Sequence, residues 1–146
     1  MNDTITFAIP GKPVGKGRPR ATTIGGHARM YTPKKTESYE SLVRMAFYNE
    51  HRARNPIPAG IPLRLTIWCW FAIPKSWSKK RQAQAMHHTG KPDADNILKV
   101  VGDALNGVAW HDDSQVSTAV VFKRYATDGE RESVMVEIMP MNDLCD

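Results

Sequence analysis

Two pairs of aspartates lie close together in the sequence. Asp93 and Asp95 flank one alanine in KPDADN, and Asp112 and Asp113 are adjacent in HDDSQV. Like charges repel, so either these side chains stay apart as solvated caps and turns or a cation lies between them. Converging carboxylates prefer Mg²⁺ or Mn²⁺ to zinc. Such an ion neutralises charge that develops on a phosphate and generates hydroxide near neutral pH.

A helix between the two acid pairs sets their positions. Its apolar residues fall on one stripe of period 3.6: Ile97, Leu98, Val101, Ala104 and Leu105. The pattern predicts a helix from about residue 96 to 106, with Gly107 just past its end. Asp95 is then at or beside the N-cap, and Asp93 lies in the loop before it. Lys99 projects from nearly the same side as Asp95.

The chain after this helix is long enough to return Asp113 to the first pair. The helix spans roughly 16 Å, and the extended chain from Gly107 to Asp113 reaches roughly 20 Å. This geometry permits, without requiring, a pocket in which Asp93, Asp95 and Asp113 hold a divalent cation. Lys99 would then add a positive charge beside the phosphate that is cut.

Basic and acidic residues occupy different parts of the chain. Residues 1–50 carry a net charge of +4, residues 51–92 carry +8 without a single acid, and residues 93–146 carry −7. A basic surface suits binding of a polyanion, and a separate acidic cluster suits binding of a cation. The alternative is an ordinary basic protein whose last third is acidic.

The hydrophobic pattern predicts an α+β fold, a single compact domain in which helices pack against a mixed β-sheet. The predicted elements are a strand over 4–9, an irregular basic loop over about 10–35, a helix from about 34 to 52, a strand over 63–71, a short helix from about 76 to 86 capped by Ser76, the helix over 96–106, and strands over 116–125 and 132–139 joined by a turn at 127–129. Trp68 and Trp70 alternate with apolar residues in the strand over 63–71, which suggests that both its faces are covered.

Length and composition narrow the class of protein. A chain of 146 residues with 41% hydrophobic and 24% charged residues suits one soluble globular domain. No run approaches the roughly 18 apolar residues of a membrane span, and the N-terminus lacks the features of a secretory signal. Cys69 in an apolar stretch and Cys145 in the tail argue against a structural disulfide and favour a cytoplasmic location.

Several of these segments together resemble a known family. PDADN, Lys99, DALNGV and DDSQV, in this order and at these separations, are similar to the signature of the RusA family of Holliday junction resolvases. A looser similarity extends over GKGRPR, PKSWSKKR and the closing strands, and so over most of the chain. The family consists of small, homodimeric, magnesium-dependent endonucleases, often encoded by phages and prophages. The resemblance implies one RusA-like endonuclease domain over 1–146, with residues 91–116 as its catalytic segment.

The resemblance assigns roles to individual residues. Asp93 and Asp95 match the family's Asp-x-Asp pair, Asp113 matches its third catalytic aspartate, and Lys99 matches the lysine one turn into the helix. These residues are therefore the expected catalytic set, and the three aspartates are the expected metal ligands. Mg²⁺ is the implied cofactor, with Mn²⁺ as a substitute.

Three neighbouring residues have weaker assignments. Asp112 adjoins the third aspartate and is expected to support it. Asp103 lies two turns beyond Asp95, which favours a structural role. His111 matches no role in the family, and a partly exposed histidine is its expected state.

The implied function is Mg²⁺-dependent hydrolysis of paired phosphodiester bonds in four-way DNA junctions, in recombination and repair. A homodimer would present two identical sites to the approximate two-fold symmetry of a junction. The expected DNA contacts are basic residues of the loop and of the short helix near 76–86: Lys12, Lys16, Arg18, Arg20, Lys75, Lys79, Lys80 and Arg81. Two alternatives remain: a non-catalytic basic DNA-binding protein, and a nuclease of the same chemistry that cuts flaps or forks.

Overall fold

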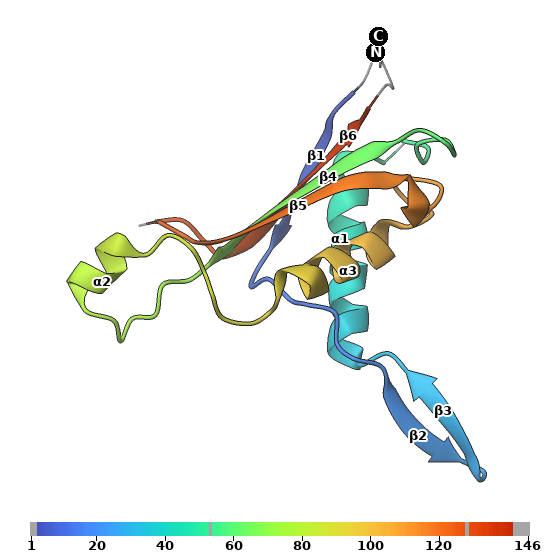
Figure 1. Ribbon diagram of the computed structural model, residues 1–146, viewed down its shortest axis with the longest axis horizontal. Helices are drawn as coiled ribbons and strands as arrows, with labels where there is room; N and C mark the ends of the chain where they lie inside the picture. Colours follow the sequence, from blue (N-terminus) through green and yellow to red (C-terminus); the bar gives the residue numbers. More distant parts are fainter. Residues whose placement is uncertain (1–2, 53, 128, 142–146) are drawn as a thin grey trace.

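A mixed sheet, a separate hairpin and three α-helices make up the domain (Figure 1). The computed structural model describes residues 3–52, 54–127 and 129–141. Within these ranges, no helix is both long and apolar enough to cross a membrane. Asp128, in the turn predicted at 127–129, and Cys145 lie outside the described residues.

The four-stranded sheet has the order β1-β6-β4-β5. β1 (Ile5–Pro10), β6 (Ser133–Pro140) and β4 (Leu63–Phe71) pair antiparallel, whereas β5 (Val116–Tyr125) runs parallel to β4. A parallel pair needs a long crossover connection, and the acidic segment 91–116 lies within it. These strands confirm the predicted ones to within a residue or two. β5 forms one edge of the sheet.

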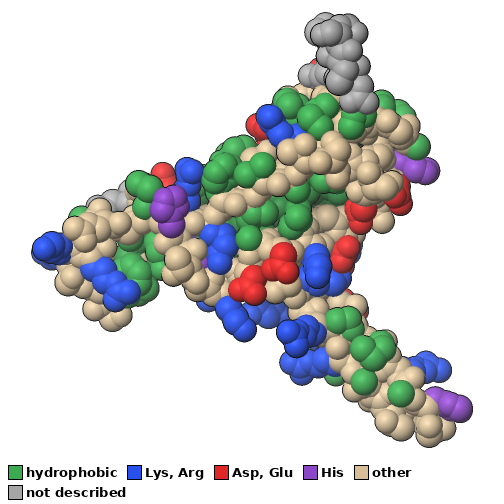
Figure 2. Space-filling model, in the orientation of Figure 1, with side chains coloured by type: hydrophobic (Ala, Val, Ile, Leu, Met, Phe, Trp, Pro, Cys, Tyr) green, Lys and Arg blue, Asp and Glu red, His purple; other side chains and the backbone are tan. Residues whose placement is uncertain are grey.

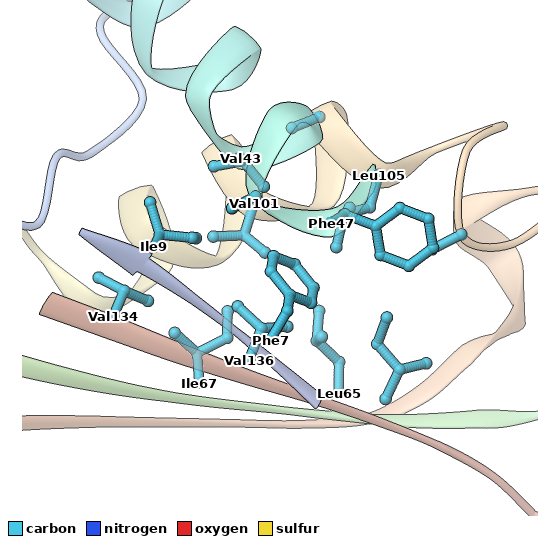
Figure 3. Close-up of a cluster of buried hydrophobic side chains, with 14 of the residues drawn as sticks. Phe7, Ile9, Val43, Phe47, Leu65, Ile67, Val101, Leu105, Val134 and Val136 are labelled. Atoms are coloured by element: carbon cyan, nitrogen blue, oxygen red, sulfur yellow. The ribbon is translucent and has the colours of Figure 1, made fainter. Parts of the chain in front are cut away.

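Two helices cover one face of this sheet. α1 (Lys34–Glu50) and α3 (Ala94–Leu105) lie on the same side of it (Figure 1) and bury their apolar stripes there. The rings of Phe7 and Phe47 meet edge to face, with centroids 5.5 Å apart, inside this cluster (Figure 3). Tyr39 and Phe47 are buried in the same core, so the apolar stripe of α1 is internal.

The opposite face of the sheet has no covering element in the described chain. Trp68 and Phe122 stack on this face, with ring centroids 5.8 Å apart. Met135, the partner of Trp68 on β6, is 40% exposed. The prediction that both faces of β4 are covered is therefore wrong for one chain. The third helix, α2 (Lys79–Gln84), contains no buried residue and so does not cover this face.

The short helix α2 belongs to a lobe that projects from one end of the sheet (Figure 1). Its N-cap is Ser78, whose hydroxyl accepts a hydrogen bond from the Arg81 N–H at 3.2 Å. The sequence placed the cap at Ser76 and the end near Met86. The helix begins later because Ser78 supplies the cap, and it ends at Gln84.

A β-hairpin projects from the other side of the molecule (Figure 1). β2 (Arg20–Ile24) and β3 (His27–Tyr31) pair antiparallel around Gly25 and Gly26, which have positive φ angles of 60° and 83°. Two such residues form the type I′ turn that suits a two-residue hairpin. The prediction of an irregular loop over 10–35 is therefore correct only for its first part. Every residue of the hairpin strands is exposed, so no buried alternation could reveal it.

Candidate active site

The N-terminus of α3 presents two carboxylates to solvent. Asp93 is the N-cap and Asp95 lies in the first turn, so the helix starts slightly earlier than its apolar stripe predicts. Asp93 caps through its backbone oxygen, which accepts from the Ile97 N–H at 3.1 Å, and its carboxylate makes no capping hydrogen bond. Both carboxylates are exposed at the positive end of a helix. They are therefore available to bind a cation.

Charged residues continue along the exposed side of α3. Asp95, Lys99 and Asp103 are four residues apart, so they lie on one ridge. Figure 2 shows acidic side chains in a row over this region, with basic side chains beside and below them. Asp103 is already neutralised, since its Oδ2 lies 3.0 Å from Lys16 Nζ. None of the ion pairs among the described residues includes Lys99.

Asp112 stabilises the turn in which it lies. It is the N-cap of a short 3-10 helix, η1 (Asp113–Gln115), and its carboxylate accepts from the Ser114 N–H at 3.0 Å. The Gln115 side chain accepts in return from the Asp112 N–H at 2.8 Å. The hydrogen bonds with Ser114 lower the pKa of Asp112. This carboxylate is thus a capping group.

Asp113 is oriented by a buried tryptophan. Trp110 Nε1 donates a hydrogen bond to Asp113 Oδ1 at 2.9 Å, and the Trp110 side chain is fully buried. The second carboxylate oxygen of Asp113 remains available for another ligand. Sequence reasoning missed Trp110, and its only signal was an indole three residues before the acid.

One chain does not bring the three expected ligands together. Asp93 and Asp95 lie at the N-terminus of α3, whereas Asp113 follows its C-terminus. The twelve residues of this helix span roughly 18 Å. Across the described ranges, no three His, Cys, Asp or Glu side chains are grouped closely enough to hold a metal ion. The return of Asp113 to the first pair is therefore not seen within the chain.

The arm that precedes β2 packs across the N-terminus of α3. The Lys16 N–H donates to the Asn96 carbonyl at 2.8 Å, and a Cβ added at Gly15 would lie 3.0 Å from the Asn96 Cβ. Lys16 Nζ lies 2.6 Å from Glu40 Oε1 of α1, in addition to its pair with Asp103. Burial works to lower the pKa of Lys16, but the hydrogen bonds to Glu40 and Asp103 outweigh it and raise the pKa. Lys16 thus joins α1 to α3.

A cleft of 520 Å³ opens between this arm and the N-termini of α1 and α3. Among the described residues, Asp93 is the only acid that lines it, and its cationic lining residues are Lys12, Lys16, Arg18, Arg20, Lys35 and Lys91. The positive ends of two helices at one place favour an anion further. The fold therefore gathers the four predicted basic residues of the arm beside Asp93. It also adds Lys35 and Lys91, which the sequence alone did not select.

The other predicted DNA contacts lie on the α2 lobe. They are exposed: Lys75, Lys79, Lys80 and Arg81. The Arg81 guanidinium lies 3.7 Å from the centroid of the Trp77 ring, and Trp77 packs edge to face on Tyr125 of β5 with centroids 5.3 Å apart. The lobe and the hairpin therefore extend from two different sides of the body (Figure 1).

The segment that leads from α2 to Asp93 is attached to β5. Lys123 Nζ donates to the Gly90 carbonyl at 2.6 Å, and the His88 N–H donates to the Lys123 carbonyl at 2.9 Å. The His88 ring stacks on Phe71, with centroids 3.6 Å apart. Burial and the positive charge of Lys123 lower the pKa of His88. A neutral His88 ring therefore helps to hold the chain segment that leads to Asp93 and Asp95.

Comparison with known proteins decides the family. A family model described as endodeoxyribonuclease RusA matches residues 10–139. The chain belongs to the RusA family. Uncharacterized protein YqaN of Bacillus subtilis (strain 168) is 34% identical over 142 residues, which cover 93% of this chain and 98% of that protein. The RusA match includes the arm, the cleft and both acid pairs, so the resemblance carried by PDADN and DDSQV is confirmed.

Magnesium is the cofactor that the RusA family implies. Mg²⁺ commonly binds one or two carboxylates, keeps several waters and takes substrate phosphate as a further ligand. Asp93 and Asp95 offer two exposed carboxylates, and the Asp93 carboxylate makes no capping hydrogen bond. This donor set fits such an ion. The cleft beside it suits the phosphate.

Proposed function

We propose that this protein is a Mg²⁺-dependent endodeoxyribonuclease that resolves four-way DNA junctions by paired phosphodiester hydrolysis, in recombination and repair. Membership of the RusA family supports the reaction class. The position of Asp93 carries the proposal: an exposed carboxylate lies in a cleft whose other charged lining residues are all cationic. Those cations attract a DNA backbone to a carboxylate pair that repels it. A divalent cation held by these carboxylates would remove this repulsion.

Each residue of the site then has a role. Asp93 and Asp95 would hold the cation, and a bound Mg²⁺ would supply charge neutralisation at the phosphate and an activated water. Lys99 places a positive charge beside the same phosphate. The cationic residues of the cleft position the backbone without reading sequence. The expected products are a 5′-phosphate and a 3′-hydroxyl.

A second copy of the chain completes the site in this proposal. Asp113 begins η1, which directly precedes β5, and Lys123 near the other end of β5 donates a hydrogen bond to Gly90, three residues before Asp93. In a two-fold dimer with antiparallel β5 strands, the beginning of one β5 lies near the end of the other. The Asp113 of one copy then approaches the Asp93 and Asp95 of the other. This arrangement supplies the third ligand that one chain lacks.

The uncovered face of the sheet is the dimer contact that we propose. Trp68, Phe122 and Met135 gather there, and contiguous apolar surface of this kind marks a protein contact. Two sheets pack face to face about 10 Å apart. Since β5 is an edge strand, such packing leaves its two ends accessible to the DNA.

Cleavage of defined DNA structures tests the proposal. The protein is incubated with a labelled four-way junction, a flap and a plain duplex, each with Mg²⁺ and with EDTA. The expected result is symmetric paired nicking of the junction in Mg²⁺ and none in EDTA. Equal cutting of all three substrates would remove the junction preference and favour a general branched-DNA nuclease. Tight binding without cutting in Mg²⁺ or Mn²⁺ would favour the non-catalytic alternative.

A further inference from the structure

The hairpin formed by β2 and β3 has no packing partner in the described chain. The two strands pair only with each other, and every residue in both is exposed. Several of these are large: Ile24 is 57%, Met30 is 68% and Tyr31 is 46% exposed. An isolated two-stranded ribbon is at best marginally stable in water. This ribbon is therefore expected to meet another molecule.

The strand register separates the ribbon into two different faces. Cross-strand partners share a face, and successive residues alternate between faces. Arg20 pairs with Tyr31, Thr22 with Arg29 and Ile24 with His27, so one face contains Arg20, Thr22, Ile24, His27, Arg29 and Tyr31. The other face contains only Ala21, Thr23, Ala28 and Met30. The first face thus carries both arginines and most of the hydrogen-bond donors of the ribbon.

The cationic face continues the wall of the cleft. Arg20 lines the cleft beside Asp93 and also begins the ribbon. Arg29 lies diagonally opposite Arg20 on the same face, at a Cα separation of about 7–8 Å. Residues 4–36 contain seven Lys and Arg residues and no Asp or Glu. Basic residues therefore extend from the cleft along this face of the ribbon as far as Arg29, with no acidic residue among them.

The base of the ribbon is fixed to the body while the ribbon itself stays free. The Gly17 N–H donates to Thr36 Oγ1 at 3.0 Å, and a Cβ at Gly17 would lie 2.8 Å from the same oxygen. Lys16 adds its two ion pairs one residue earlier. This anchoring sets the direction of the ribbon relative to Asp93. Figure 1 shows that the ribbon extends away from the sheet and helices.

We infer that the β2–β3 ribbon holds the duplex arm that lies next to the cut phosphate, through Arg29 and Tyr31 on its cationic face. This inference rests on the proposed function, because the cleft must bind a DNA backbone first. Strands of five residues extend roughly 17 Å, and a two-stranded ribbon fits the major groove, which is about 12 Å wide. The ribbon contacts phosphates and groove edges outside the catalytic cleft.

Binding of a labelled four-way junction in EDTA tests the ribbon. Arg29→Gln should raise Kd roughly three- to tenfold and reduce the slope of log Kd against log salt by about 1. A chain in which an Asn-Gly turn replaces residues 21–30 should lose at least as much affinity. That turn can close the ribbon because Arg20 and Tyr31 are paired.

Two matched variants serve as controls. Arg52→Gln removes an exposed arginine just beyond the far end of α1, and Met30→Gln changes the other face of the ribbon. Both should bind the junction with the wild-type Kd. Sedimentation should give the same oligomeric state for every variant, and thermal melting should confirm that each is folded.

The outcomes separate the ribbon from the proposed function. If Arg29→Gln and the shortened chain bind like Arg52→Gln while the wild type still cuts junctions, the ribbon inference is wrong and the proposed function stands. Loss of affinity in Met30→Gln, or a change in oligomeric state, would show that the ribbon docks on protein and would also overturn it. A wild type that neither binds nor cuts junctions would overturn both.

Discussion

The acids of this chain differ in the partners that their carboxylates already have. Asp103 is paired with Lys16, and Asp112 accepts a hydrogen bond within its own turn. Asp113 has one oxygen bonded to an indole and one available. Asp93 and Asp95 belong to none of the ion pairs found in the described ranges. The sequence favours a structural role for Asp103 and a supporting role for Asp112, and the structure shows the partner that each of these two carboxylates has.

The hydrogen bond between Trp110 and Asp113 yields a testable prediction about single residues. Trp110→Phe keeps most of the apolar volume but removes the N–H that orients the carboxylate. Junction cutting should fall about tenfold, and the Mg²⁺ concentration for half-maximal cutting should rise, because the third ligand is less well placed. The free energy of unfolding should fall by about 1 kcal/mol.

Asp112→Asn is the matched control for Trp110→Phe. It weakens the cap of the same turn without touching the indole, so it should lower stability slightly and leave the Mg²⁺ requirement unchanged. Single-turnover cutting over a Mg²⁺ series measures both variants. An unchanged Mg²⁺ requirement in Trp110→Phe would contradict the role assigned to this hydrogen bond.

Among the secondary-structure elements, α3 depends on the arm that crosses its N-terminus. The arm approaches so closely at Gly15 that any side chain there would collide with the start of α3: a Cβ would lie 2.7 Å from the Pro92 Cβ, just before the helix, and 3.0 Å from the Asn96 Cβ within it. Lys16 then joins the arm to both long helices. The position of the acidic pair relative to the cationic cleft is therefore a property of three packed segments.

Two glycine substitutions test this packing. Gly15→Ala should push the arm off α3, lower the free energy of unfolding and reduce junction cutting. Gly102→Ala, in the middle of the same helix, meets nothing within 4 Å and should raise the free energy of unfolding by up to about 1 kcal/mol with cutting unchanged. Urea unfolding and cutting rates measure both. A Gly15→Ala protein as stable and active as the wild type would contradict the close packing.

The His88 ring predicts how the segment before α3 responds to pH. Its pKa in the folded protein lies below the ordinary value of 6.5, so the unfolded chain binds the proton more tightly. This contribution to the free energy of unfolding is complete above about pH 6.5 and is lost as the pH falls through the folded pKa. His88→Gln should flatten the pH dependence in that window.

His87→Gln is the control for this measurement, since the neighbouring His87 side chain is exposed. Urea unfolding at a series of mildly acidic pH values gives the slope for each protein. A slope in His88→Gln equal to that of the wild type would show that another group causes it.

The whole molecule has one covered and one uncovered sheet face, with the acid pairs at opposite ends of α3. The dimer that we propose, in which each site takes Asp113 from the other copy, would account for both features. If both acid pairs served one site within a chain, α3 would have to be much shorter or the turn after it would have to run back along it. The hydrogen bond from Gly107 N to the Trp110 carbonyl holds that turn at the C-terminal end instead.

Mixing two inactive variants tests shared sites. Asp95→Asn and Asp113→Asn should each lose cutting alone. After unfolding and refolding together, a mixed dimer has one site with both substitutions and one with neither, so nicking should return to roughly a quarter of the wild-type level. If the mixture stays inactive while each variant still forms dimers, each site belongs to one chain.

Sequence reasoning succeeded wherever burial imposes a pattern. The stripes of α1 and α3 and the alternation in β4 predicted these elements because each has one face in the core. The β2–β3 ribbon was not predicted, because none of its residues is buried and burial therefore imposes no pattern on its sequence. The motif around Asp93 and Asp113 identified the family, but residue spacing permits several paths after α3, so it could not fix where Asp113 lies.

Asp95→Asn is the most direct test of the central claim, that the carboxylates at the N-terminus of α3 hold the cation required for cutting. Asp103→Asn, two turns along the same ridge, is its control. The account predicts that Asp95→Asn binds a four-way junction within about twofold of the wild type but cuts it at least about 100-fold more slowly in Mg²⁺, while Asp103→Asn still cuts. Cutting by Asp95→Asn at the wild-type rate would contradict the site.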